Sequence, residues 1–272
     1  MPKADSINSP QVGAHVSIQG GVENAPEMAR ELGCEVMQIF SRPPQGGTGQ
    51  ELTPEVIKNF KLKIESCGLK AVYIHAPYYI NLASTENRIR YGSIGAIRTE
   101  LERASLLGAK YVMTHLGSAK EMENSEAIKK VIEGLEKVLD GYNGSAKLLI
   151  ENSAGAGKII GADIKEIEDI LSKIKHPALA GICLDTQHGF ASGYDWKSGI
   201  NFENIKLIHA NDSATDLGSR KDRHEHIGKG KIGMDGFAQI AAFAKKQKID
   251  LICETDYPEV TEDIKVLKKL IK

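Results

Sequence analysis

The chain has few cysteines and no pairing pattern among them. Its four cysteines are Cys34, Cys67, Cys183 and Cys253, which contain no C-x-x-C spacing and form no even framework. This pattern argues against a secreted protein stabilised by disulfides, and we expect a reduced, intracellular protein.

Long apolar segments and a strong charge imbalance are also missing. No run approaches the ~18 apolar residues of a membrane span, and the start MPKADSINSP lacks the apolar part of a secretory leader. We expect a cytoplasmic protein with no membrane association and a flexible N-terminus over residues 1–10. The net charge of −1 argues against a strongly basic binder of any nucleic acid, although bound cations are absent from that sum.

The chain lacks a G-x-G-x-x-G loop after its first apolar run, and it contains no linker or low-complexity tract. It contains instead short apolar runs, typical of buried strands, at 11–16, 35–40, 71–75, 110–115, 147–151, 181–185, 205–209 and 250–254. Patterns with the helical period separate them, most clearly at 128–139, 164–174 and 264–271. Eight such units favour a single (β/α)₈ barrel over residues 11–272, and a doubly wound open sheet is the alternative.

Acidic residues and histidines end most of the expected strands. They are His75, His115, Glu151, Asp185, His209 and Glu254. One histidine at a strand end is usually structural, but in a barrel the carboxyl ends of all strands meet on one face, where active sites form. We therefore expect these side chains to share one site.

A polar loop supplies a second group. His188 follows Asp185 by three residues, and Asp222 and His224 are spaced i, i+2, so an extended loop points both the same way. Alone, this loop is explained equally well as a solvated surface. Beside the strand-end residues, it predicts that His188, Asp222 and His224 hold a further ion.

Carboxylates crowded into one site would repel one another and raise their own pKa values. Divalent cations remove that cost, and imidazole with carboxylate suits Zn²⁺ and Mn²⁺. A cluster of such ions can bind a phosphodiester and stabilise a departing oxygen. The composition of the site therefore predicts a metal-dependent enzyme acting on phosphate esters.

At these residues the sequence resembles the endonuclease IV family of apurinic/apyrimidinic (AP) endonucleases, which have a xylose-isomerase-like barrel. The matching segments are GAHVS at 13–17, HAPYYINLA at 75–83, THLGS at 114–118, IENSAGAG at 150–157, LDTQHGFASGYD at 184–195, HANDS at 209–213, GSRKDRHEHIGKGKIG at 218–233 and ICET at 252–255. They follow the family order along nearly the whole chain. The GSR-DRH-HIG segment is the most specific of them.

The resemblance implies three zinc ions per chain, with Mn²⁺ an alternative at one site. The implied ligand groups are His75, His115 and Glu151; Asp185, His209 and Glu254, with Glu151 bridging; and His188, Asp222 and His224. Glu151 and Glu254 are the implied catalytic residues. His15, which ends the first strand, is expected to hydrogen-bond to a ligand instead of binding an ion.

The implied activity is that of a deoxyribonuclease IV in base excision repair, a phosphoric diester hydrolase. It cuts 5′ to an abasic site, leaving a 3′-hydroxyl and a 5′-deoxyribose phosphate, and it also cleans blocked 3′ ends. The implied partner is damaged double-stranded DNA, bound by a monomer at the nucleoid. Expected DNA contacts are Tyr78 and Tyr79 as a wedge, Arg42 and Gln45 in the 40–49 loop, and Arg220, Arg223, Lys229 and Lys231 on phosphates. Gln45 stands where the family has arginine, and Pro43–Pro44 stiffens that loop.

Two other functions remain open. A sugar isomerase or epimerase on the same barrel would need only Glu151, Asp185, His209 and Glu254. The additional ligands His75, His115, His188, Asp222 and His224 distinguish the nuclease from it. A catalytically inactive DNA-binding or scaffold protein would have no reason to keep all nine polar groups together.

Overall fold

Eight parallel strands close into a barrel. In the computed structural model, which describes residues 9–120 and 122–272, neighbours follow the order β1-β10-β7-β6-β5-β4-β3-β2, and every pair is parallel. The strands are β1 (Val12–His15), β2 (Val36–Phe40), β3 (Val72–His75), β4 (Tyr111–Thr114), β5 (Lys147–Glu151), β6 (Leu179–Asp185), β7 (Ile205–His209) and β10 (Leu251–Cys253). Of the expected flexible N-terminus, residues 1–8 lie outside the described residues.

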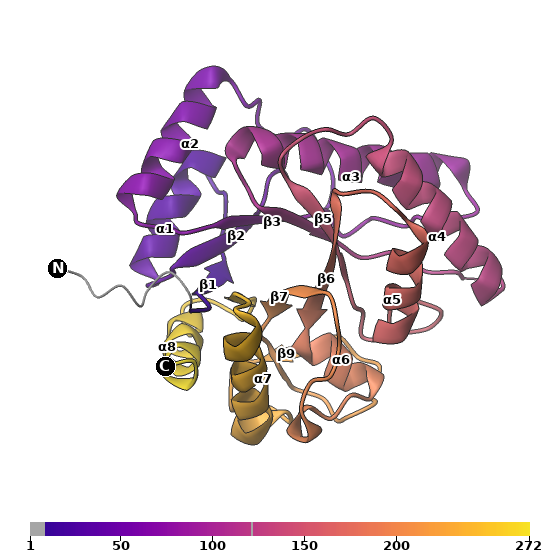
Figure 1. The fold of residues 1–272 in the computed structure, drawn as a ribbon. Coiled ribbons are helices and arrows are strands. Elements are labelled where there is room, and N and C mark those ends of the chain that lie inside the picture. Colours follow the sequence, from indigo (N-terminus) through magenta and orange to yellow (C-terminus); the bar gives the residue numbers. More distant parts are fainter. Residues whose placement is uncertain (1–8, 121) are drawn as a thin grey trace.

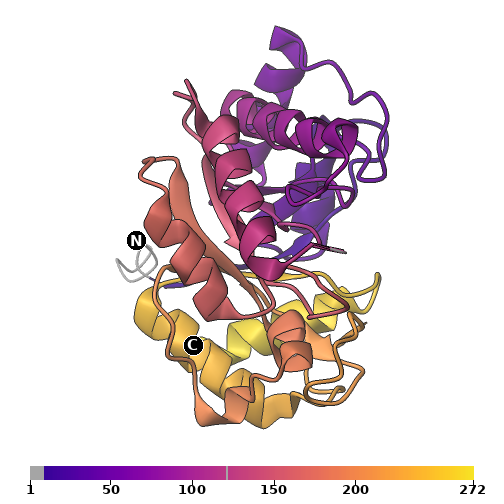
Figure 2. The same cartoon turned by 90° about the vertical axis from the view of Figure 1, so that its right-hand side faces the viewer.

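Helices form a ring around the strands, as Figure 1 shows. They are α1 (Ala25–Glu31), α2 (Pro54–Ser66), α3 (Asn87–Leu107), α4 (Asn124–Leu139), α5 (Ile164–Lys173), α6 (Thr186–Ser192), α7 (Gly233–Gln247) and α8 (Val260–Leu270), with short 3-10 turns at Val22–Asn24 and Trp196–Ser198. In the view of Figure 2, helices of the first half of the chain lie above those of the second half. The last helix, α8, packs beside β1 and so closes the ring.

Local sequence signals set several helix ends. The Thr53 side chain accepts a hydrogen bond from the Val56 amide at the start of α2, and Asp163 does the same for Lys165 at the start of α5. Such side-chain caps satisfy amides that have no partner within the helix. Helix α3 ends at Leu107 and is followed by Gly108, whose φ of 78° is the left-handed conformation that favours glycine.

The core has two layers. Inside the barrel a compact group of buried side chains fills the space between the strands: Val36, Tyr73, Met113, Leu149, Cys183, Leu207 and Ile252. A larger layer of aliphatic side chains packs between the strands and the helices. The interior is therefore a packed core, and the open end that remains is the one formed by the carboxyl ends of the strands.

The observed elements confirm the barrel predicted from the sequence. Each barrel strand falls at its expected place, with ends shifted by at most two residues; His115 and Glu254 each lie one residue beyond their strands. A small antiparallel pair, β8 (Asp212–Ser213) and β9 (His224–Glu225), was not predicted. Within the described part of the chain, none of the helices has the length and apolar character needed to cross a bilayer.

Candidate metal centre

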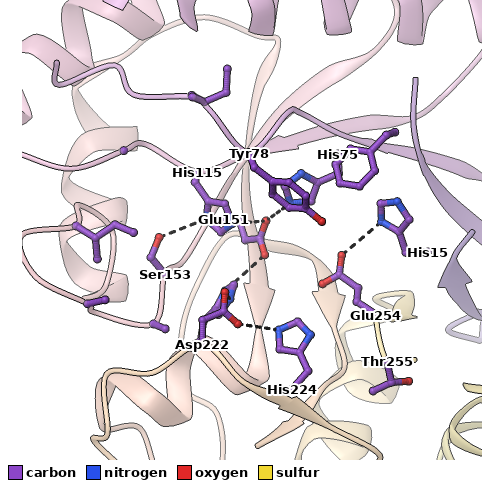
Figure 3. A pocket seen from close by; sticks show the side chains of 17 residues that line it. His15, His75, Tyr78, His115, Glu151, Ser153, Asp222, His224, Glu254 and Thr255 are labelled. Carbon is purple, nitrogen blue, oxygen red and sulfur yellow. Dashed lines mark hydrogen bonds and ion pairs between the residues drawn. The ribbon is translucent and has the colours of Figure 1, made fainter. Parts of the chain in front are cut away.

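Four of the six polar strand-end residues line one cavity, and the other two, Asp185 and His209, are fully buried beside Glu151 and Glu254. The volume of the cavity is about 660 Å³, and its lining includes residues from both halves of the chain: His15, Phe40, His75, Tyr78, His115, Glu151, Ser153, His188, Asp222, His224, Glu254 and Thr255. Figure 3 shows the labelled histidines and carboxylates turned toward one another in this space. The barrel therefore gathers side chains that are far apart in the sequence.

Three neighbouring strands supply the first ligand group, His75, His115 and Glu151, whose ligand atoms lie within 4.8 Å of one another. Glu151 Oε2 is 2.8 Å from His75 Nε2 and 3.6 Å from His115 Nε2. The Nδ1 atom of His75 lies 2.6 Å from the Ala76 carbonyl oxygen and donates to it. The Nε2 nitrogen of His75 is thereby the one directed into the cavity.

The second group is Glu151, Asp185, His209 and Glu254, also within 4.8 Å. His209 Nδ1 is 2.9 Å from Glu151 Oε1 and 3.2 Å from Glu254 Oε2. Strand β6 reaches this group through irregular pairing, since its register shifts against both β5 and β7. Such irregularities re-aim side chains at strand ends.

The third group differs slightly from the expected one. The ligand atoms of Asp185, His188 and His224 lie within 4.8 Å, so Asp185 is shared between the second and third groups. Asp222 lies beside them, with Oδ2 3.3 Å from His188 Nε2 and Oδ1 3.4 Å from His224 Nε2. Thus all nine expected ligands come together. Asp222 is the most exposed of the carboxylates in these groups, with 61% of its side chain accessible.

The histidines and carboxylates of the centre strongly shift one another's pKa values. Burial raises the pKa of Glu151, but His115, His209 and His75 outweigh it, and the pKa lies well below its usual range. Burial lowers the pKa of His188, but the carboxylate of Asp185 and the hydrogen bond to Asp222 raise it to about 10. The carboxylate of Glu151 therefore stays ionised, as a ligand of a cation must be.

Two buried amides that the sequence analysis did not single out support the second group. Gln38, on β2, contacts His209 and Glu254. Asn211 Nδ2 donates to Asp185 Oδ2 at 2.8 Å and to Glu254 Oε2 at 3.2 Å. Gln38 is a polar residue inside the apolar strand VMQIF, and a buried polar side chain needs a hydrogen-bond partner. This was the signal in the sequence that could have identified it.

A buried carboxylate anchors the loop that carries Asp222 and His224. Asp212 is fully buried and accepts hydrogen bonds from five backbone N–H groups, those of Ser213, Gly228, Gly230, Ile232 and Gly233. At Gly230 the approach is so close that a Cβ would lie 2.5 Å from Asp212 Oδ1. This aspartate fixes both ends of the 213–233 loop.

His15 lies where the sequence analysis expected it, next to a ligand. Its Nδ1 is 3.0 Å from Gln38 Nε2 and 3.7 Å from Glu254 Oε1. Its ring also packs on Phe40, with the centroids 4.4 Å apart. His15 thus supports Glu254 and does not belong to any of the three ligand groups.

Aromatic side chains stand at the rim of the cavity. Tyr78 is 64% exposed and Tyr79 42% exposed, so neither is a core residue. Tyr78 lines the cavity and packs edge-on against Phe40, with centroids 5.0 Å apart. Both rings are therefore accessible from solvent, and Tyr78 is also accessible from the cavity.

The neighbouring loop, between β2 and α2, holds Arg42 and Gln45. The Arg42 guanidinium pairs with the buried carboxylate of Glu100 at 2.5 Å and donates to the Ala96 carbonyl. Arg42 thus ties the loop to α3, which leaves its side chain little freedom to reach a DNA strand. Gln45 is exposed at the tip of the loop.

Basic residues surround the loop of the third group. Arg220, Arg223, Lys229 and Lys231 are all exposed. Arg220 has a left-handed backbone, with a φ of 56°, and lines a second, smaller cavity beside the first. Lys231 pairs loosely with the exposed Asp216 at 3.7 Å. The rim therefore carries positive charge although the whole chain is nearly neutral.

Known proteins share this architecture. Residues 26–270 match the family model of the xylose isomerase-like TIM barrel. Chains named "Probable endonuclease 4" are similar: that of Nitrosopumilus maritimus is 35% identical over 95% of this chain and 98% of its own, and that of Methanoculleus marisnigri is 36% identical over 93% and 94%. The crystal structure of endonuclease IV from Thermus thermophilus superimposes with a TM-score of 0.84 at 32% identity, covering 96% of this chain and 99% of that one. A D-tagatose 3-epimerase-like protein shares the fold, with a TM-score of 0.74 at 21% identity over 95% and 97%.

Proposed function

The chain belongs to the endonuclease IV family within the xylose isomerase-like TIM barrels, and from this membership we propose that it is a metal-dependent AP endonuclease of DNA repair. It hydrolyses the phosphodiester 5′ to an abasic site in duplex DNA and leaves a 3′-hydroxyl and a 5′-deoxyribose phosphate. It also removes blocking groups from 3′ ends. The observation that carries the proposal is the convergence of three ligand groups, each of which contributes residues to the lining of one cavity.

The side chains fit divalent cations. Their donors are imidazole nitrogens and carboxylate oxygens, which suit zinc and, without sulfur, also manganese. His224 Nε2 is buried and has no hydrogen-bond partner among the described residues, and a cation bound by His188, Asp222 and His224 would satisfy it. Each of the three groups would hold one Zn²⁺, with Mn²⁺ an alternative in one of them, and Glu151 belongs to both the first and the second group.

The bound ions supply Lewis-acid stabilisation for the charge that builds up on phosphate oxygens during hydrolysis. Glu151 sits at the centre of the cluster and Glu254 at its open side, where its side chain is 14% exposed. Both carboxylates are thereby placed to orient the groups that take part in hydrolysis of the phosphodiester, and we propose Glu151 and Glu254 as the catalytic residues.

The rim residues fit a bent DNA duplex. Tyr78 and Tyr79 present exposed rings beside the cavity, and inserting such side chains at a lesion holds the damaged nucleotide out of the stack. Backbone phosphates on either side of the lesion would be bound by positively charged side chains, those of Arg220, Arg223, Lys229 and Lys231. Gln45 faces solvent and completes the proposed contact surface. We leave Arg42 outside it because of its ion pair with Glu100.

A sugar epimerase or isomerase is the second candidate, because Glu151, Asp185, His209 and Glu254 alone form a four-ligand group. Such an enzyme has no need for the other ligands. His75, His115, His188, Asp222 and His224 nevertheless line the same cavity, which favours the nuclease. An inactive scaffold is disfavoured for the same reason, since nine polar groups held together are costly without cations.

The proposal predicts that the purified protein nicks a duplex carrying one tetrahydrofuran abasic analogue. Glu254→Gln should lower the rate by on the order of 100-fold or more, because it removes a charge that orients the reacting groups. Electrophoresis of an end-labelled strand measures the cut and its position.

Glu262→Gln is the matched control, since Glu262 lies on the exposed surface of α8 and forms an ion pair with the exposed Lys265. It should cut as fast as the unchanged protein. Ketose–aldose interconversion without nicking would transfer the assignment to the epimerase. Binding of the duplex with neither activity would indicate the inactive scaffold.

A further inference from the structure

A single buried amide joins the parts of the second ligand group. Gln38, midway along β2, is fully buried. Its Nε2 donates to Glu254 Oε1 at 2.6 Å and lies 3.0 Å from His15 Nδ1, while its Oε1 is 2.7 Å from His209 Nε2. All the hydrogen-bonding capacity that the amide directs into the centre is thus used.

The orientation of this amide follows from its neighbours. An ionised carboxylate can only accept hydrogen bonds, so the amide nitrogen must face Glu254. The amide oxygen must then face His209. Because an oxygen can only accept, His209 must carry its proton on Nε2. In the neutral ring the lone pair that can bind a cation is therefore on Nδ1, and a cation there would replace the proton that Nδ1 directs to Glu151 Oε1 at 2.9 Å.

Other histidines of the centre are oriented by backbone atoms. The Nδ1 of His75 donates to the Ala76 carbonyl, and the Nδ1 of His188 lies 3.0 Å from the Asn152 carbonyl. These partners are backbone carbonyl groups, so they remain when the side chain of Ala76 or Asn152 is substituted. For His209 the partner is a side chain, so the orientation of its ring depends on one residue that can be substituted.

We propose that Gln38 is a positioning residue for the second ion: its oxygen selects the ring nitrogen of His209 that binds the ion, and its nitrogen holds Glu254 Oε1 so that Oε2 faces the same point. The inference rests on the proposed function only in assuming that the centre holds divalent cations. Partners that orient ligating residues typically change metal affinity by about 10–100-fold when they are lost.

Gln38→Met tests the proposal, because methionine has nearly the same length and cannot form these hydrogen bonds. Zinc-loaded protein is titrated with a competing chelator, and the ions that remain per chain are measured by elemental analysis. We expect one ion to be released at a free zinc concentration about 10–100-fold higher than in the unchanged protein, with the others retained. Gln50→Met is the control: Gln50 also accepts from an amide, that of Val22, and donates to a carboxylate, Glu23, but does not contact the ligand groups.

A spectroscopic measurement separates positioning from loss of packing. In nitrogen-labelled protein loaded with zinc, the Nε2 proton of His209 should be protected from exchange, and Gln38→Met should remove that protection. The Nδ1 proton of His75 serves as an internal reference and should not change, because its partner is the Ala76 carbonyl. Gln38→Glu keeps an oxygen acceptor at the position and should retain the protected proton, which keeps the test decisive if the methionine variant does not fold.

Unchanged release of all ions from folded Gln38→Met, or loss of the protected proton in Gln38→Glu, would overturn the role of Gln38. Either result leaves the nuclease assignment intact if the unchanged protein still holds its ions and nicks abasic DNA. Failure of the unchanged protein to retain any ion would instead overturn both proposals together.

Discussion

At the scale of single residues, the centre depends on several buried polar groups whose hydrogen-bond partners are specific. Asp212 illustrates this dependence, because its carboxylate satisfies amides at both ends of the 213–233 loop. Hydrogen bonds to a charged group contribute more than those between neutral groups. The loop that positions Asp222 and His224 therefore owes its shape to one carboxylate.

Asp212→Asn is predicted to lower the free energy of unfolding by about 2–3 kcal/mol, because one oxygen becomes an NH₂ group that faces backbone donors and leaves them without an acceptor. Urea unfolding monitored by circular dichroism measures the change. Asp216→Asn provides the comparison, since Asp216 is 87% exposed and should alter stability by less than about 0.5 kcal/mol. Equal stability of the two variants would refute the anchoring role of Asp212.

At the scale of elements, the strands approach one another so closely that side-chain size is limited. Gly13 on β1 lies against β2, and a Cβ built there would be 1.7 Å from the Val36 carbonyl oxygen. Glycine is thus required by packing at this position. Gly95 in α3 is different, because a Cβ there meets no atom within 4 Å.

Two alanine substitutions should therefore have opposite effects. Gly13→Ala must push β1 from β2 and is expected to lower the free energy of unfolding by more than about 3 kcal/mol, in the range of severe overpacking. Gly95→Ala should raise it by about 0.5–1 kcal/mol, because alanine loses less backbone entropy in a helix. Thermal and urea unfolding of both proteins distinguish these outcomes, and a stable Gly13→Ala barrel would contradict the close approach of β1 and β2.

At the scale of the whole molecule, the centre couples the two halves of the chain. Its ligands extend from His75 to Glu254, and its supports from Gln38 to Asn211. Ions held by such ligands bind the folded chain better than the unfolded one and so stabilise the barrel as a unit. We propose that residues 11–272 fold as one domain.

Removal of metal is therefore predicted to lower the unfolding midpoint without splitting the transition. One site at a free ion concentration of 100 Kd adds about 2.7 kcal/mol to the free energy of unfolding. In a chain of this size class, each kcal/mol shifts the unfolding midpoint by about 2–4 °C. Differential scanning calorimetry of chelated and zinc-restored protein measures the shift, and elemental analysis should find three ions in the restored form. Two separate transitions would contradict a single folding unit, and an unchanged midpoint would contradict metal binding by the folded barrel.

Much of the fold and of the candidate ligand clusters could be predicted because both depend on local patterns. Apolar runs bounded by helical periods indicate strands of a parallel sheet, and a polar residue at a strand end needs no distant information to be noticed. His75, Glu151 and His209 were found in this way. The β8–β9 pair was missed because two-residue strands have no periodicity to detect.

The sequence by itself determined which residues end the strands, since the period of a strand and its apolar run are properties of neighbouring positions. Only the tertiary structure decided which of these residues meet. The closure and register of the barrel place Asp185 in two ligand groups. They also bring Arg42 into an ion pair with Glu100, and Gln38 into contact with His209, which is 171 positions away in the chain. Contacts of this kind depend on the angle and distance between whole elements, which short-range sequence patterns do not encode.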